Sequence, residues 1–235
     1  DTARDGVRID LQPGATQASA LFAAMAQRQC TRNEYDGKPL SSDELALLQR
    51  AGSSDRVRLL LLTDKTKMEQ VLEVIVQGNT VQVNNPAFAA ELKDWIRFSA
   101  ADAVRLGDGL YSATSGNPSL PAWLGKPMFN FFFTAKAEND KIAKQMRSSA
   151  GVAVFVGQNN DKAHWIEVGR AYQRFALQAT VLGVRNAFLN QPVEVTALRP
   201  QFAALLGLGG LRPDLVVRFG HGPAMPPSLR RPVGA

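Results

Sequence analysis

The sequence predicts a layered domain of the α/β or α+β class, and three observations support this prediction. Apolar runs typical of buried strands occur at 57–64, 151–157 and 214–220. Segments with apolar residues at helical spacing separate these runs. The chain has 235 residues, of which 45% are hydrophobic and 20% charged, as in soluble globular proteins. Strands that alternate with helices in such a chain are typical of a sheet covered by helices.

The helices are predicted from apolar spacing and from signals at their ends. Ser41 stands three residues before Glu44, which is the spacing of a capping box at a helix start. Gly78-Asn79 and Gly183 are expected to end two helices, because glycine and asparagine favour the backbone conformation that follows a helix. The expected helices cover 19–28, the stretch after Ser41, 65–79, 86–97, 140–150, 163–182 and the stretch after Pro200.

Two segments differ in composition from this pattern. Residues 1–18 are a polar lead-in, within which 7–11 alternates apolar and polar residues like a short edge strand. Residues 98–135 combine many glycines and prolines with large apolar side chains. Long loop-rich stretches inside compact domains are often functional covers. We therefore expect 98–135 to form a lid-like insertion in a domain that spans 19–235.

Charge and composition argue against several kinds of site. The net charge is +6, but the basic residues are spread out rather than gathered in blocks, so no nucleic-acid partner is expected. Cys30 is the only cysteine, which excludes an internal disulfide and a structural zinc site. His164 and His221 are far apart, so no metal site is expected. No apolar run approaches the roughly 20 residues of a membrane helix, and DTARDGVRID at the start lacks the apolar core of a signal peptide.

The motifs of common catalytic and nucleotide sites are absent from the sequence. It contains neither the glycine fingerprint of dinucleotide-binding domains nor a P-loop, and it has no nucleophile elbow. Cys30 has no nearby histidine that could serve as its base. Asp161, His164 and Glu167 flank a helix start, where we expect them to be structural. No side chain is therefore predicted to be a catalytic acid, base or nucleophile.

Two arginine pairs are candidate anion sites. Arg28 and Arg32 flank small polar residues near the N-terminus, and Arg230 and Arg231 stand near the C-terminus. Arginine is suited to bidentate contact with phosphate. Solvated surface charge explains the same pattern, so spacing alone leaves both interpretations open.

Three segments resemble motifs of the nitroreductase superfamily of flavoproteins, in that family's order. RQCTRNEYDGKPLSSDEL (28–45) is similar to the family's opening signature. VLGVRNAFLNQP (181–192) is similar to the segment that leads into the flavin-ring loop, and RFGHGPAMPPSLRRPV (218–233) is similar to the family's ending. The stretch 91–110 resembles an actinobacterial subgroup that has two half-repeats and a lid over the flavin. Within that subgroup, this chain resembles the second half.

The resemblance implies an α+β nitroreductase-like fold, with a central mixed or antiparallel sheet flanked by helices. It implies that 19–235 form an FMN-binding domain. The residues that it places on FMN are Arg28, Gln29, Cys30, Arg32, Gly183, Val184, Arg185, Asn186, Arg230 and Arg231. Cys30 stands where the family usually has serine, and the family's Gln-Pro-Trp stretch on the flavin has no counterpart after Ser53 and Ser54.

The function implied by the resemblance is that of an FMN-dependent reductase. NAD(P)H would reduce the flavin, and the flavin would pass hydride to a nitro, quinone or related acceptor, while the protein supplies positioning and electrostatics. Two alternatives stay open: a non-catalytic protein that stores FMN under a closed lid, and a basic scaffold without a cofactor. The resemblance also implies a homodimer, or pairing with a missing half-repeat. The expected location is the cytoplasm, or outside it if an N-terminal segment not present here directs export.

Overall fold

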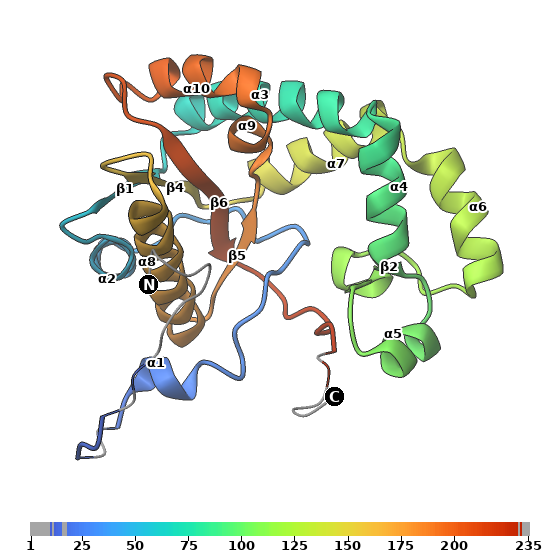
Figure 1. The fold of residues 1–235 in the computed structure, drawn as a ribbon, viewed down its shortest axis with the longest axis horizontal. Helices are drawn as coiled ribbons and strands as arrows, with labels where there is room; N and C mark the ends of the chain where they lie inside the picture. Colours follow the sequence, from blue (N-terminus) through green and yellow to red (C-terminus); the bar gives the residue numbers. More distant parts are fainter. Residues whose placement is uncertain (1–9, 11, 16–17, 230, 232–235) are drawn as a thin grey trace.

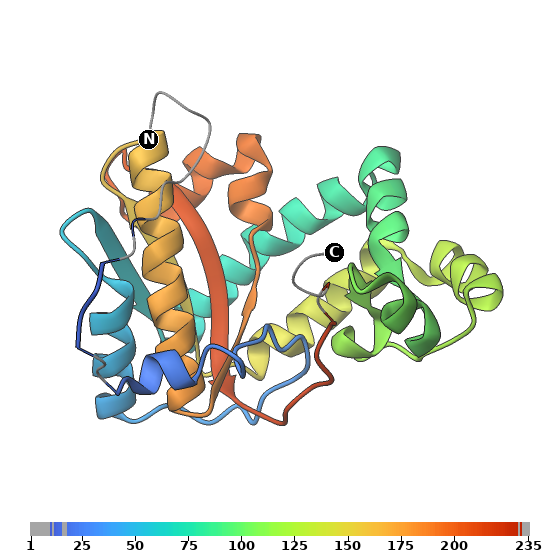
Figure 2. The same ribbon diagram turned by 60° about the horizontal axis from the view of Figure 1, so that its bottom comes forward.

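The fold consists of a body and a projecting helical arm, as seen in a computed structural model that describes residues 10, 12–15, 18–229 and 231. In the body, helices cover both faces of a sheet (Figure 1). Residues 86–133 form the arm, which stands beside the body in both views (Figure 2). The edge strand expected at 7–11 lies outside the described residues, apart from Asp10, which is not in a strand.

A four-stranded sheet organises the body. Its strands are β1 (Val57–Leu62), β4 (Gly151–Gly157), β5 (Val184–Phe188) and β6 (Pro213–His221). Their order is β1-β4-β6-β5, and every pair of neighbours is antiparallel. The predicted α+β class is therefore confirmed, with an antiparallel sheet. The three apolar runs are strands, whereas β5 was not predicted from the sequence.

Helices of the body form a layer on each face of the sheet (Figure 1). Those on one face are α2 (Ser42–Gly52) and α8 (Lys162–Val181), with the single turn α1 (Ala20–Ala23) beside α8. Those on the other face are α3 (Lys65–Val83), α7 (Ala135–Arg147), α9 (Gln191–Glu194) and α10 (Arg199–Leu205), with a 3-10 turn at Thr196–Leu198. Within the described residues, no helix is both long and apolar enough to span a bilayer.

The central strands are buried on both faces, and alternate side chains enter two separate cores. In β4, Ala153 and Phe155 belong to the core beneath α2 and α8. Val152 and Val154 belong to the core beneath α3 and α7. Because successive side chains of a strand point to opposite faces, the continuous apolar run of β4 supplies both cores. Neither core cluster includes a residue of the arm.

The arm is more regular than the sequence predicts. It contains α4 (Pro86–Trp95), β2 (Ile96–Arg97), α5 (Ala100–Leu106), β3 (Leu110–Tyr111), a 3-10 turn (Ser112–Ser115) and α6 (Ala122–Phe132). The expectation of a loop-rich stretch at 98–135 is therefore wrong. Two of its glycines mark helix ends instead: Gly107 follows α5 in the left-handed conformation, with φ 61°, and Gly116 follows the 3-10 turn with φ 74°.

Helix α3 continues past its predicted end at Gly78-Asn79. Gly78 is needed for packing rather than for termination, since a Cβ atom there would lie 2.8 Å from the Cβ of Gln191 in α9. Asn79 is buried, and its Nδ2 donates to Oδ1 of Asn139 in α7 at 2.7 Å. Tertiary contacts therefore override the local end signal, and the helix runs to Val83.

Three other predicted helices also differ from the structure in length. The helix expected over 19–28 ends at Ala23, and a turn leads from there to Arg28, whose amide donates to Ala24. The helix expected over 86–97 ends at Trp95, where the chain enters β2. The helix expected over 140–150 begins earlier, at Ala135, because the Thr134 side chain caps it. The capping box of Ser41 and Glu44 at the start of α2 is confirmed.

Candidate functional site between the arm and the body

A cavity of about 390 Å³ lies between the arm and the body, and its two walls differ in chemistry. The arm contributes mainly apolar side chains, among them Phe88, Leu92, Phe98, Met128, Phe129 and Phe132. The body contributes apolar side chains such as Ile142 and Leu189 together with polar and charged ones beside the end of β5, among them Arg32, Gln145, Gln191, Arg218, Lys141 and the acidic Glu138. A space of this size with an apolar wall and a few convergent polar groups is typical of a small-molecule site.

The N-terminal segment 28–35 brings Arg32 to this cavity. The amide of Thr31 donates to the carbonyl of Asn186 in β5 at 2.9 Å, which ties the segment to the edge of the sheet. The buried Tyr35 hydroxyl donates to the carbonyl of Thr31 at 2.9 Å. Burial raises the pKa of Tyr35, so this hydroxyl stays protonated and keeps donating. The hydrogen bonds of Thr31 and Tyr35 therefore hold the chain on both sides of Arg32.

Arg218 is the central side chain of the polar wall. It stands in β6 and is fully buried, with an exposed fraction of 0%. Its neighbour along one face of the strand is Val216 of the α3–α7 core. Burial lowers the pKa of Arg218, the direction expected for a cation taken out of water. The guanidinium carbon lies 4.1 Å from the centre of the Tyr35 ring, a cation–π contact that stabilises the charge.

Two polar atoms in the cavity residues lack hydrogen-bond partners. Among the described residues, Oε1 of Gln191 and Nε of Arg218 are buried without a partner, as is Oγ1 of Thr31. Buried polar groups in folded proteins are nearly always paired. One unpaired acceptor and one unpaired donor therefore belong to residues that line the same cavity, although both atoms are closed to solvent.

Arg28 and Cys30 lie beside α8 rather than in the cavity wall. Sγ of Cys30 lies 3.8 Å from the hydroxyl of Tyr172 in α8, and that hydroxyl donates to Oδ1 of Asn186 at 3.2 Å. Burial raises the pKa of Tyr172, Cys30 raises it further, and the nearby Arg28 opposes the rise. Arg28 and Arg32 thus face different surroundings, although only four residues separate them.

Other predicted site residues hold the C-terminal segment against the body. Nε2 of Gln29 donates to the carbonyl of Met225 at 2.9 Å, and Nε of Arg185 donates to the carbonyl of Gly222 at 3.2 Å. Gly183 precedes β5 with φ 70°, while Val184 and Asn186 are buried within the strand. These residues therefore surround the crossing of three segments, 28–35, β5 and the chain after β6.

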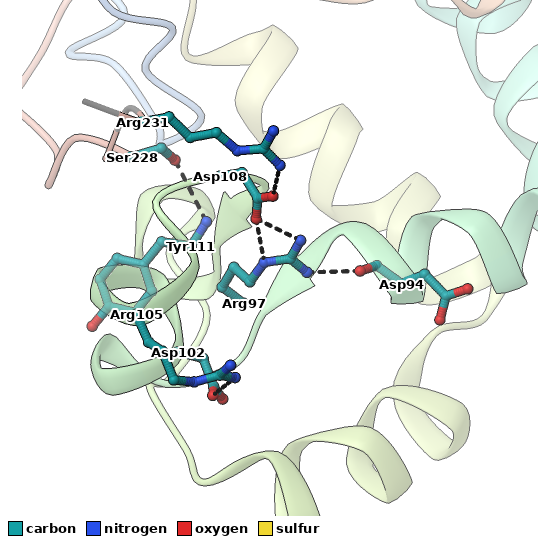
Figure 3. Close-up of polar contacts among 8 residues, drawn as sticks. All are labelled: Asp94, Arg97, Asp102, Arg105, Asp108, Tyr111, Ser228 and Arg231. Carbon is teal, nitrogen blue, oxygen red and sulfur yellow. Dashed lines mark hydrogen bonds and ion pairs between the residues drawn. The ribbon is translucent and has the colours of Figure 1, made fainter. Parts of the chain in front are cut away.

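Arg231 forms an ion pair with a residue of the arm. It donates to Asp108, and Arg97 of β2 holds the other oxygen of the same carboxylate with Nη2 at 2.7 Å (Figure 3). The amide of Tyr111 also donates to the Ser228 hydroxyl at 3.5 Å (Figure 3). Hydrogen bonds from Arg231 and Arg97 lower the pKa of Asp108, so it stays ionised between them. Arg230 lies outside the described residues.

The sequence reasoning missed Arg218, Gln145 and Gln191. One signal was available for Arg218, because an arginine interrupts the otherwise apolar run DLVVRFG. A charged residue in the middle of a predicted buried strand demands a partner or a function. Gln145 and Gln191 lie on helices and carry no local signal, since only the packing of the arm makes them part of a cavity wall.

The side chains at the start of α8 pair with each other and with the helix backbone. Asp161 caps the helix by accepting from the amide of His164 at 2.9 Å and from its Nδ1 at 2.8 Å. The His164 amide and ring lower the pKa of Asp161. Among the described residues, no group of three or more histidine, cysteine or acidic residues could hold a metal ion.

Comparison with known proteins gives weak sequence similarity to nitroreductases. No protein-family model matches the chain. Two proteins of Mycobacterium tuberculosis, from strains CDC 1551 and H37Rv, are provisionally named NAD(P)H nitroreductases, and each is 22% identical to the chain over 221 residues. The match covers 90% of this chain, which spans 60% of the length of those relatives.

Solved structures show stronger similarity in the fold. A Bacteroides fragilis nitroreductase with bound FMN has a TM-score of 0.56 at 14% identity, with 92% of this chain and 97% of that chain covered. A Desulfitobacterium hafniense nitroreductase with bound FMN has a TM-score of 0.57 at 12% identity, with 92% and 95% covered. The FMN-dependent nitroreductase of Mycobacterium smegmatis in complex with NADPH has a TM-score of 0.54 at 11% identity, with 86% and 87% covered. The resemblance noted in the sequence is thus confirmed at the level of architecture, and the chain has the nitroreductase fold.

Proposed function

We propose that the chain is an FMN-dependent oxidoreductase of the nitroreductase type, which takes hydride from NAD(P)H and passes it to a nitro, quinone or related acceptor. The observation that carries this proposal is the cavity with an aromatic, mainly apolar wall on the arm and a wall on the body that includes Arg32 and several polar side chains. Structural neighbours with bound FMN, and one in complex with NADPH, support the choice of cofactor and donor.

The residues of the cavity fit a flavin. FMN has a flat ring with an apolar edge, a pyrimidine edge that both donates and accepts hydrogen bonds, and a phosphate. The arm offers aromatic side chains to the apolar part, and the body offers the half-buried guanidinium group of Arg32 and the side chain of Gln191 to the polar edge. When bound, FMN would supply the redox chemistry, and the chain would supply binding, orientation and exclusion of water.

The remaining predicted contacts stay part of the proposal. The crossing beside the cavity is surrounded by Arg28, Gln29, Cys30 and residues 183–186. These residues would hold the ribityl and phosphate part of FMN. Arg230 and Arg231 are proposed for the phosphate from the C-terminal segment. For Arg231, this role requires release of its ion pair with Asp108.

We further propose that the functional unit contains two such domains, either as a homodimer or by pairing with a second half-repeat. The chain spans 60% of the length of its relatives, which leaves room in them for further sequence. Helix α8 also exposes Trp165 and Ile166, with exposed fractions of 46% and 48%. Such apolar side chains on a long helix are suited to contact with a second domain.

Purified protein tests the cofactor and the activity separately. We expect a yellow protein with a flavin absorbance spectrum, which releases FMN when it is denatured. A colourless protein that does not bind added FMN would overturn the proposal and favour the basic scaffold. Bound FMN without turnover of NADH or NADPH, with quinone and nitroaromatic acceptors supplied, would favour storage over catalysis.

A further inference from the structure

Arg218 is a buried cation in β6. It lies on the face of β6 that packs against α3 and α7, where its partner in the neighbouring strand β4 is a valine. Its side chain is inaccessible to water. Among the described residues, no carboxylate forms an ion pair with it. Burying an unpaired charge is costly, so the surrounding groups must compensate.

Backbone carbonyl groups provide that compensation, and two of the three come from the segment that carries Arg32. Nη2 of Arg218 donates to the carbonyl of Asn33 at 2.7 Å and to that of Thr31 at 3.3 Å. Nη1 donates to the carbonyl of Gln145 at 3.3 Å. Nε2 of Gln145 in turn donates to the carbonyl of Arg32 at 2.9 Å. The carbonyl groups of residues 31, 32 and 33 are therefore all held, two by Arg218 and one by Gln145.

The side chain at the centre of this arrangement is free for a ligand. Arg32 is half-buried in the cavity wall, and among the described residues its guanidinium group forms no hydrogen bond or ion pair. It also lines a second, smaller hollow of about 310 Å³ next to Lys141 and Lys144 of α7. A guanidinium group binds a planar polar ligand well only when its direction is fixed, because misplacement loses the paired hydrogen bonds.

We propose that Arg218 is a positioning residue: it fixes the carbonyl groups on both sides of Arg32, and so holds the Arg32 guanidinium toward the polar end of the ligand in the arm cavity. This inference rests on the proposed function, in which that ligand is FMN. Arg218 is suited to the task because one planar group can reach several carbonyl groups at once. Lysine, with its single charged nitrogen, can satisfy only part of this arrangement.

A double-mutant cycle with FMN as the probe tests the inference. Affinity is measured by quenching of FMN fluorescence for the wild type, Arg32→Ala, Arg218→Met and the double variant. We expect each single change to weaken binding at least tenfold. We expect the double variant to bind no more than about threefold more weakly than the weaker single variant, because Arg218 acts through Arg32. Wild-type affinity in Arg218→Met, or losses that multiply in the double variant, would overturn the inference.

A second, milder variant tests the inference if Arg218→Met does not fold. Gln145→Met removes the bond to the carbonyl of Arg32 and leaves Arg218 in place, and we expect it to weaken FMN binding about threefold. The control is Gln49→Met, because Nε2 of Gln49 in α2 donates to the carbonyl of Leu59 and to the Ser53 hydroxyl, each at 3.0 Å, and Gln49 is not among the cavity-lining residues. Equal FMN affinity for Gln145→Met and Gln49→Met would contradict the positioning role.

Hydrogen exchange without FMN separates this inference from the proposed function. We expect the amides of residues 31–35 to exchange at least tenfold faster in Arg218→Lys than in the wild type, while exchange in β4 stays unchanged. Unchanged exchange at 31–35 would overturn the positioning role of Arg218. Faster exchange in a protein that binds no FMN would support the positioning role and overturn FMN as the ligand.

Discussion

Arg28 and Arg32 are four residues apart, and their surroundings assign them different tasks. Arg28 lies beside Tyr172, whereas Arg32 lies in the cavity wall. Under the proposed function, Arg28→Ala should weaken FMN binding at least tenfold, since about 1.4 kcal/mol corresponds to a factor of ten. Arg28→Lys should restore only part of the affinity, because lysine keeps the charge but loses the planar fork.

Fluorescence titration checks this prediction, and Arg170→Ala provides the control. Arg170 is an exposed arginine of α8 that pairs with Glu167 at 2.8 Å, away from the cavity. Its loss should leave FMN affinity unchanged. If Arg28→Ala bound FMN as tightly as Arg170→Ala does, Arg28 would be surface charge.

Glu44 makes stability depend on pH at the start of α2. Its carboxylate accepts from the amide and the hydroxyl of Ser41, each at 2.8 Å, and lies 2.9 Å from Nε2 of His221. These contacts, the Ser41 amide foremost, lower the pKa of Glu44. The unfolded chain therefore binds the proton more tightly than the folded chain, so this stabilisation is present at neutral pH and is lost as pH falls through the folded-state pKa.

Glu44→Gln tests this pH dependence by thermal unfolding. At pH 7 the variant should melt at a lower temperature than the wild type, because a neutral amide interacts less strongly with the helix start and with His221. The difference should shrink below about pH 4, where an ordinary glutamate becomes protonated. A difference that stays constant from neutral to acidic pH would show that the charge of Glu44 does not matter.

At the scale of elements, two glycines in helices are predicted to respond in opposite ways to alanine. In α3, a Cβ atom on Gly78 would meet the Cβ of Gln191 at 2.8 Å and its carbonyl oxygen at 2.9 Å. Backbone of α9 cannot move cheaply, so overpacking should cost about 1–3 kcal/mol and outweigh the better helix propensity of alanine. In α8, Gly169 has nothing within 4 Å, so Gly169→Ala should stabilise by up to about 1 kcal/mol.

Urea unfolding of both variants checks this pair. The free energy of unfolding should fall for Gly78→Ala and rise for Gly169→Ala. The first change should also weaken FMN binding, because Gln191 lines the cavity. Stabilisation by both substitutions would mean that α9 yields easily and that Gly78 is not a packing requirement.

At the scale of the whole molecule, the body is predicted to fold without the arm. Both core clusters draw only on the body, and α3 and α7 are joined directly by the bond between Asn79 and Asn139. Replacing residues 86–133 by a short glycine-serine linker should therefore leave cooperative thermal unfolding intact. The same change removes the apolar wall of the cavity, so any bound FMN should become more accessible to iodide quenching.

The control for the arm deletion is the point variant Trp123→Ser, which alters an exposed arm residue with an exposed fraction of 77%. It should change neither unfolding nor quenching. Loss of cooperative unfolding in the deletion would show that the arm is part of the folding unit. Unchanged quenching would remove the role of the arm as a cover.

The pairing of two domains is tested by light scattering on the flavin-bound protein. We expect a mass near twice the 25.5 kDa of one chain. Trp165→Glu should shift the distribution toward single chains, because a charge would then face the contact. A mass of one chain with FMN bound would contradict the proposed pairing.

The sequence by itself determined the α+β elements of the body and the resemblance to nitroreductases. The three apolar runs became β1, β4 and β6, and the run is uninterrupted in β4, because burial on both faces requires an apolar side chain at every position there. The capping box at Ser41 and the apolar stripe of α8 could likewise be predicted from the sequence, since both depend on spacing within a few residues.

Only the tertiary structure decided where β5 pairs, where α3 ends and which residues meet at the cavity. β5 is an edge strand, with the half-exposed Arg185 among buried residues, so its local pattern is weak and its pairing with β6 defines it. Gly78 is an end signal in isolation but a close contact once α9 packs there. Arg218 joins Thr31 and Asn33 across about 185 residues of chain. Local spacing carries no information about such contacts, because they exist only after the sheet order and the packing of the arm have formed.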